Sequence, residues 1–267
     1  MTLFSSEKKQ LNDNESDTSS CEYDGPKDYQ PNNILLCATH GKIYALHKRN
    51  GNKLWSTKFP SGAMGGIVSI FVTDFDKVIV GANGKTACLD LMTGKTLWLN
   101  RMSGFGYEEV SVISTPSRIL TPKKEPVTDS PPEYSESHSL GKPIIFGCSR
   151  GKVMAMDAES GNELWRYNCP GGWYNIPVAI VEPPSWEDHQ PDQLVYIGAG
   201  KWVYCLQSQT GDVVWSTKVS TAVFGLNYMT LATPWSSRLA AEAYSAFSQN
   251  PSAQTRDRER EDERRSS

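Results

Sequence analysis

Short runs in which apolar and polar residues alternate recur along the middle of the chain, from about Asn32 to Lys218. One unit reads "GIVSIFVT" (66–73), "KVIVGAN" (77–83), "KTACLDL" (85–91) and "KTLWLNR" (95–101). A period of two is typical of half-buried β-strands, and connections this short join neighbouring strands as antiparallel hairpins. No connection within the unit is long enough for a crossover helix. The pattern therefore excludes a parallel α/β sheet and predicts an all-β fold of four-stranded antiparallel sheets.

Four such units are recognisable, but the first is incomplete. It has three clear strands, "NILLCAT", "KIYALHK" and "KLWSTKF". We expect another part of the chain to supply the missing strand. The segment "VFGLNYMTLATPW" (Val223–Trp235) is a candidate, and its pairing with the first unit would close a ring of sheets.

A ten-residue phrase ends each unit, as in "MDAESGNELW" (Met156–Trp165), with a glycine four residues before a tryptophan. The four pairs are Gly51 and Trp55, Gly94 and Trp98, Gly161 and Trp165, and Gly211 and Trp215. Glycine supplies the positive φ that a tight turn often needs, and the tryptophan on the next strand can cover a neighbouring sheet. The interval from Trp55 to Trp98 matches the ~40–45 residues of a four-stranded propeller blade. We interpret the phrase as a structural docking motif, not a cofactor site.

The phrase resembles the tryptophan-docking signature of PQQ-like β-propellers, the quinoprotein alcohol dehydrogenase-like superfamily. "AMDAESGNELW" (Ala155–Trp165) and "CLDLMTGKTLW" (Cys88–Trp98) match closely, and "ALHKRNGNKLW" and "CLQSQTGDVVW" match with substitutions. The resemblance implies a propeller of PQQ-like blades. Its members include quinoprotein dehydrogenases, an outer-membrane assembly lipoprotein and the carboxy-terminal propeller of β-alanine-activating enzymes, and we expect a non-dehydrogenase member like the last. Four blades would make a small ring, so we also consider a partial ring, a truncated product, and a half that pairs with another chain.

Composition and the repeats together predict how the chain is divided into segments. We predict a disordered tail over 1–30, a propeller over 31–235, a short helix over 236–249 and a charged disordered tail over 250–267. The insertion 121–141, "TPKKEPVTDSPPEYSESHSLG", is rich in Pro, Ser and charge and is predicted to be a disordered loop.

The sequence gives little support for redox or metal chemistry. Quinoprotein dehydrogenases often use adjacent cysteines and hold calcium near a catalytic Asp, whereas this chain has no adjacent cysteines and its Asp90 and Asp157 fall in the turn of the repeated phrase. We therefore expect neither PQQ nor calcium, no metal site and no catalytic residues. The cysteines alternate with Ala and Gly between copies, so we expect small buried side chains.

The connections between units carry the residues we single out as a surface for a ligand or partner. Such connections emerge together on one face of a propeller, and here they place aromatic residues beside glycine. The candidates are Phe105, Tyr107, Glu108, Trp173, Tyr174, Asn175 and Phe224. The alternative interpretation is that these aromatics fill the central channel as core.

Charge and hydropathy bear on partners and location. A net charge of −3 gives no overall basic surface for nucleic acid. No run approaches the ~18 apolar residues of a membrane span, and the polar first residues lack a signal peptide. We expect a cytoplasmic protein, with the nucleus also open, whose partner is another protein or a second copy of itself. We predict a non-catalytic interaction or ligand-sensing module; the alternatives are a quinoprotein-like oxidoreductase and an accessory domain of an adenylating enzyme.

Overall fold

The computed structural model describes residues 29–60, 69–119, 138–139, 142–172, 176–182, 193–221 and 229–233. Within them the regular structure is β-sheet apart from one 3-10 turn, η1 (Pro31–Asn33). The all-β fold predicted from the alternating pattern is confirmed. In the described part of the chain, no helix is long and apolar enough to cross a membrane.

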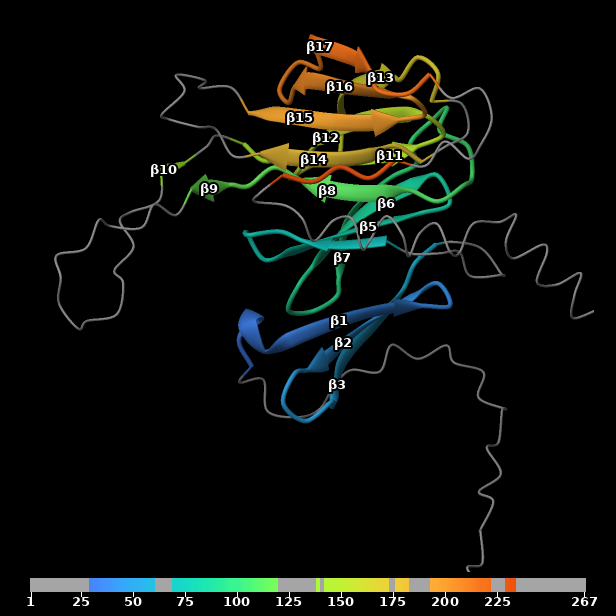
Figure 1. Ribbon diagram of the computed structural model, residues 1–267. Helices are drawn as coiled ribbons and strands as arrows, with labels where there is room; N and C mark the ends of the chain where they lie inside the picture. Colours follow the sequence, from blue (N-terminus) through green and yellow to red (C-terminus); the bar gives the residue numbers. More distant parts are fainter. Residues whose placement is uncertain are drawn as a thin grey trace, which may run out of the picture.

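Four antiparallel sheets follow one another along the chain (Figure 1). The first sheet contains β1 (Ile34–Thr39), β2 (Lys42–His47) and β3 (Lys53–Lys58). The second contains β4 (Ser69–Val72), β5 (Lys77–Ala82), β6 (Lys85–Asp90) and β7 (Thr96–Asn100). The third contains β8 (Ser111–Ser114), β11 (Ile144–Ser149), β12 (Lys152–Asp157) and β13 (Glu163–Asn168). The fourth contains β14 (Val178–Glu182), β15 (Leu194–Ala199), β16 (Trp202–Gln207) and β17 (Val213–Lys218).

A two-stranded ribbon lies at the base of the insertion in the third sheet. It pairs β9 (Arg118–Ile119) with β10 (His138–Ser139). The sequence predicts a structureless loop over 121–141, whereas the structure places His138–Ser139 of this segment in a β-strand. Its physical reason is that β8 and β11 are hydrogen-bonded neighbours, which brings the two flanks of the insertion together.

Apolar side chains fill the space between each pair of successive sheets. Between the first and second sheets they include Ile43, Ala45, Phe59, Val78 and Val80; between the second and third, Ile79, Met102, Phe105, Ile145 and Met154; between the third and fourth, Phe146, Val153, Val195, Ile197 and Leu206. Alternate residues of β5 thus point to opposite neighbours: Val78 and Val80 to the first sheet and Ile79 to the third. Both faces of an inner sheet are covered, which is why its central strands are almost continuously apolar.

The first sheet lacks the strand equivalent to β4. In the three complete sheets the first strand is the inner one, since β4 contacts β8 and β8 contacts β14. The hairpin that joins β1 to β2 corresponds to the one that joins β5 to β6, so β1 is equivalent to β5. The strand that is missing from the described first sheet is therefore the innermost strand.

The described part of Val223–Trp235 does not supply that strand. A Cβ built on Gly198 of β15 would lie 2.6 Å from Met229 Sδ and 3.3 Å from Leu231 Cγ. Gly81, the equivalent residue of the second sheet, would meet Val110 and Val112 at the start of β8 in the same way. Residues 229–231 therefore continue past the fourth sheet, where a next inner strand would begin. The four sheets follow one another in an arc, with the first and fourth sheets at its opposite ends (Figure 1). The prediction that Val223–Trp235 closes the ring by pairing with the first sheet is therefore wrong for its described part, residues 229–233.

Changing Gly161 to alanine tests the packing between sheets. A Cβ there would lie 2.5 Å from Trp98 Cδ2, whereas no atom of the described chain lies within 4 Å of a Cβ on Gly51, which has nearly the same φ (+72° and +71°). In both variants we expect the free energy of unfolding to fall by about 1–2 kcal/mol, because alanine disfavours positive φ. We expect Gly161→Ala to lose about 1–3 kcal/mol more from overpacking.

Urea unfolding of dilute protein measures the difference between these two variants. Equal losses for Gly161→Ala and Gly51→Ala would contradict close packing of Trp98 on the third sheet.

Candidate functional site

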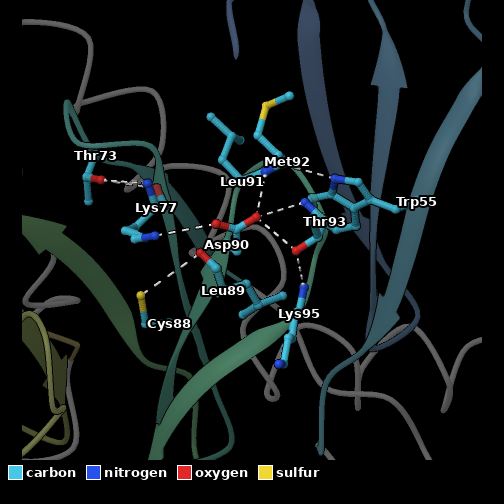
Figure 2. Close-up of polar contacts among 10 residues, drawn as sticks. All are labelled: Trp55, Thr73, Lys77, Cys88, Leu89, Asp90, Leu91, Met92, Thr93 and Lys95. Atoms are coloured by element: carbon cyan, nitrogen blue, oxygen red, sulfur yellow. Dashed lines mark hydrogen bonds and ion pairs between the residues drawn. The ribbon is translucent and has the colours of Figure 1, made fainter. Parts of the chain in front are cut away.

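Three of the four docking tryptophans lie on the glycine of the next sheet. Trp55 Nε1 donates a hydrogen bond of 3.0 Å to Leu91 O, and a Cβ on Gly94 would lie 2.4 Å from its ring (Figure 2). The same contact joins Trp98 to Gly161 and Ala158 O (2.9 Å), and Trp165 to Gly211 and Ser208 O (2.9 Å). Only a residue without a side chain leaves room for the indole ring at this distance. The repeated phrase therefore holds neighbouring sheets together.

The two ends of this series differ from its middle. Trp215, in the fourth sheet, is 42% exposed, whereas Trp55 is 6% exposed. Gly51, in the first sheet, has open space above it. The docking residues predicted from the sequence thus form three complete pairs, and the outermost glycine and tryptophan are left over.

The two aspartates at the start of the phrase's turn, Asp90 and Asp157, are bound to their own turns. Asp90 Oδ1 accepts hydrogen bonds from Met92 N (3.2 Å), Thr93 N (3.0 Å) and Thr93 Oγ1 (2.8 Å), and its other oxygen lies 3.4 Å from Lys77 Nζ (Figure 2). Burial opposes ionisation of Asp90, but the bonds from Thr93 and Lys77 outweigh it and hold its pKa below the ordinary value. The backbone N–H and hydroxyl of Ser160 likewise lower the pKa of Asp157.

These carboxylates do not fit the calcium or quinone chemistry that the superfamily resemblance implies. Their lone pairs point into the turns, which they stabilise by capping backbone N–H groups. Elsewhere in the described chain, no group of three or more His, Cys, Asp or Glu side chains is placed to hold a metal ion. We therefore derive no reaction step from them.

Four of the five described cysteines are buried, as the sequence predicts, and none of the five forms a disulfide within the described chain. Burial raises the pKa of Cys88 and of Cys169 to about 12, and it also raises that of Cys148. A thiol with so high a pKa is a poor nucleophile at neutral pH, because the thiolate is the reactive form. Cys37 is the exception, since it is exposed on the outer face of the first sheet.

One face of the arc is built from the described residues that follow β3, β7, β13 and β17 and from the hairpins at 40–41, 83–84, 150–151 and 200–201, and we call it the loop face. The connection 101–110 lies between two of these hairpins. Gly84 N donates to Glu108 O (2.8 Å), and Arg150 Nε lies 3.5 Å from Glu108 Oε2. Lys152 Nζ donates to Gly104 O (2.8 Å). The loop is therefore fixed to the second and third sheets at several points.

The predicted surface residues of this loop differ in how far they are exposed to solvent. Phe105 is 0% exposed, so its proposed place on an accessible surface is wrong; its ring packs into the core with Met102 and Ile145, beneath the cations of Lys152 and Arg166. Tyr107, by contrast, is 87% exposed. Glu108 is half-buried in its ion pair. Trp173, Tyr174, Asn175 and Phe224 lie outside the described residues.

Basic side chains are concentrated at this edge of the sheets. Lys42 lies directly opposite Lys58, and Lys218 lies opposite Trp202, next to Lys201. The basic residues here are Lys42, Lys58, Lys85, Arg101, Arg150, Lys152, Lys201 and Lys218. The net charge of −3 conceals this local excess. The signal in the sequence is the Gly-Lys pair that recurs in all four hairpins of this face, at Gly41, Gly84, Gly151 and Gly200, and turn geometry alone does not require the lysine.

Alkylation of the native protein tests the burial of the cysteines. At pH 7.5 we expect iodoacetamide to modify Cys37 and to spare Cys88, Cys148, Cys169 and Cys205, since the latter are buried and burial also raises the pKa of Cys88, Cys148 and Cys169. Peptide mass mapping gives the extent of modification, and unfolded protein gives the fully reactive control. Modification of Cys88 or Cys169 as fast as Cys37 would contradict the packing of the central strands.

Comparison with known proteins follows the same repeats. The family model described as outer membrane protein assembly factor BamB matches residues 39–121 and 149–233. Quinohemoprotein alcohol dehydrogenase of Comamonas testosteroni is 24% identical over 217 residues, which cover 77% of this chain and 27% of that protein. BamB of Escherichia coli (strain K12) is 31% identical over 100 residues, which cover 33% of this chain and 23% of BamB.

Similarity to solved structures is low, both in sequence and in superposition. A europium-containing methanol dehydrogenase superposes with a TM-score of 0.44 and 15% identity, covering 70% of this chain and 40% of its own. The chain spans about a quarter of the length of the two curated relatives. Since the family model matches more than half of its residues, the chain belongs to the BamB-type family of PQQ-like repeats, with the propeller fold of the quinoprotein alcohol dehydrogenase-like proteins.

Proposed function

We propose that this chain is a non-catalytic interaction module that binds a protein partner through its loop face. The observation that carries the proposal is Tyr107, which is 87% exposed on a loop fixed by hydrogen bonds to two sheets. An exposed aromatic residue on a rigid backbone offers a large contact area at little cost in conformational entropy.

The charges around Tyr107 favour an acidic partner surface. Lys152 Nζ donates a hydrogen bond to Gly104 O, and Arg101 is exposed close by in the chain. Glu108 is paired with a further cation, Arg150. Opposite charges across an interface speed association and select among partners.

The similarity to BamB, whose name describes a protein assembly factor, also supports a role in protein binding. The 24% identity to a quinohemoprotein alcohol dehydrogenase is the observation that favours a quinoprotein-like oxidoreductase as the second candidate. We favour binding because Asp90 and Asp157 are engaged by their own turns. A role beside an adenylating enzyme, the absence of PQQ and calcium, and a cytoplasmic location stay predictions.

Site-specific photocrosslinking in cells tests the proposal. We expect p-benzoylphenylalanine in place of Tyr107 to crosslink to a protein. The same group in place of Asn162, an exposed residue at the opposite edge of the third sheet, is the matched control. Lys152→Glu combined with the probe at Tyr107 should reduce the yield severalfold, because it reverses a charge beside the contact.

Two results would overturn this function. One is a crosslinking yield at Tyr107 no higher than at Asn162. The other is stoichiometric quinone in the purified protein together with dye-linked alcohol oxidation, which would establish the oxidoreductase instead.

A further inference from the structure

The two ends of the arc carry the two halves of one contact. Inside the arc, a tryptophan covers the glycine of the next sheet three times, and the nearest ring atom lies 2.4–2.6 Å from an added Cβ. At the first sheet, no described atom lies within 4 Å of a Cβ on Gly51. At the fourth sheet, Trp215 is 42% exposed. One end therefore presents an unfilled glycine position and the other an uncovered tryptophan.

The turn around Gly51 already has the conformation that accepts an indole ring. Gly51 N donates to His47 O at 2.9 Å, as Gly94 N does to Asp90 O at 2.9 Å. His47 N donates to Asn52 O at 2.8 Å, as Asp90 N does to Lys95 O at 2.9 Å. Docking at Gly51 therefore requires no rearrangement of the turn, and little conformational entropy is lost there on binding.

The hydrogen-bonding groups of the internal contacts recur at both ends. Each docked indole N–H donates to the carbonyl oxygen of the turn's second residue, which is Leu91, Ala158 or Ser208. The equivalent residue in the turn of the first sheet is Lys48. Two residues beyond the tryptophan, Thr57 Oγ1 donates to Gly94 O at 2.6 Å. The fourth sheet has Thr217 at this position, and its acceptor would be Gly51 O.

The outer face of the first sheet exposes positions that are core in its neighbour. Leu35 is 51% exposed and Cys37 is exposed, whereas the equivalent Val78 and Val80 of the second sheet are fully buried. At the other end, Trp215 leans on Tyr196 with 6.0 Å between ring centroids. The two ends thus continue the apolar interface that joins each pair of sheets within the arc.

We propose that two copies of this chain associate head to tail, with Trp215 of each copy docked on Gly51 of the other. Because the first and fourth sheets lie at opposite ends of the arc (Figure 1), a single chain cannot make this contact with itself. The occupant is a second copy because this chain carries both complementary surfaces, and each repeats an interface that it already forms three times. Two such contacts leave no open end, so assembly stops at a closed dimer.

Light scattering of the full chain, over a range of concentrations, gives the mass and the dissociation constant. We expect a dimer whose affinity falls at least tenfold in Trp215→Ser and in Gly51→Ala. Val214→Ser, at an equally exposed neighbour on β17, is the matched control and should leave the affinity within about twofold. Circular dichroism and urea unfolding of each variant establish that the monomer stays folded.

Mixing the two variants tests the head-to-tail geometry. The Trp215→Ser copy keeps Gly51 and the Gly51→Ala copy keeps Trp215, so the mixture regains one complete contact and should form heterodimers that neither variant forms alone. A monomeric wild type would overturn the proposal. Dimers that persist in Gly51→Ala, as in a Trp215-to-Trp215 contact, or a mixture that stays monomeric, would also overturn it.

Discussion

The structure depends on one contact, the indole of a tryptophan lying on the glycine of the next sheet. The glycine leaves space for the ring and supplies the positive φ of its turn, while the indole N–H is satisfied by a carbonyl of the same turn. The contact fixes the distance between successive sheets, so that Val78 and Val80 of one sheet pack in the same core cluster as Ile43 and Ala45 of another. Since each sheet contacts mainly its neighbours, the arc resembles a repeat protein in which identical interfaces add along one direction.

This arrangement separates the stabilising part of the molecule from the part that can vary. The cysteines and turn aspartates belong to the stabilising part, where burial raises the pKa of the Cys88 and Cys169 thiols and turn hydrogen bonds occupy the carboxylates. The loop face carries Tyr107 and the basic side chains on connections that the sheets hold in place. Function in such folds resides in residues displayed by a rigid scaffold, and the fold alone does not determine it.

The sequence predicts the sheets well because alternation and turn chemistry are local properties. It also predicts that the tryptophan of each phrase covers a neighbouring sheet. It does not predict that the ring lies on the glycine of the next phrase, because that contact joins residues 39 or more positions apart in the chain. It could not separate Phe105 from Tyr107: both are aromatic residues beside glycine in one loop, and only the position of Lys152 and Arg166 above the core shows which is buried. The same limit applies to Cys37, whose exposure depends on whether another sheet covers the first, and to residues 229–231, whose neighbour Gly198 is distant in sequence.

Hydrogen exchange at the indole N–H groups tests the central contact most directly. With 15N-labelled tryptophan, and with each resonance assigned by a Trp→Phe substitution, exchange is followed at a concentration where the chain is monomeric. The account predicts slow exchange for Trp55, Trp98 and Trp165, whose N–H groups bond to the next sheet, and fast exchange for Trp215. Exchange of Trp98 or Trp165 as fast as that of Trp215 would contradict the docking of each sheet on the next.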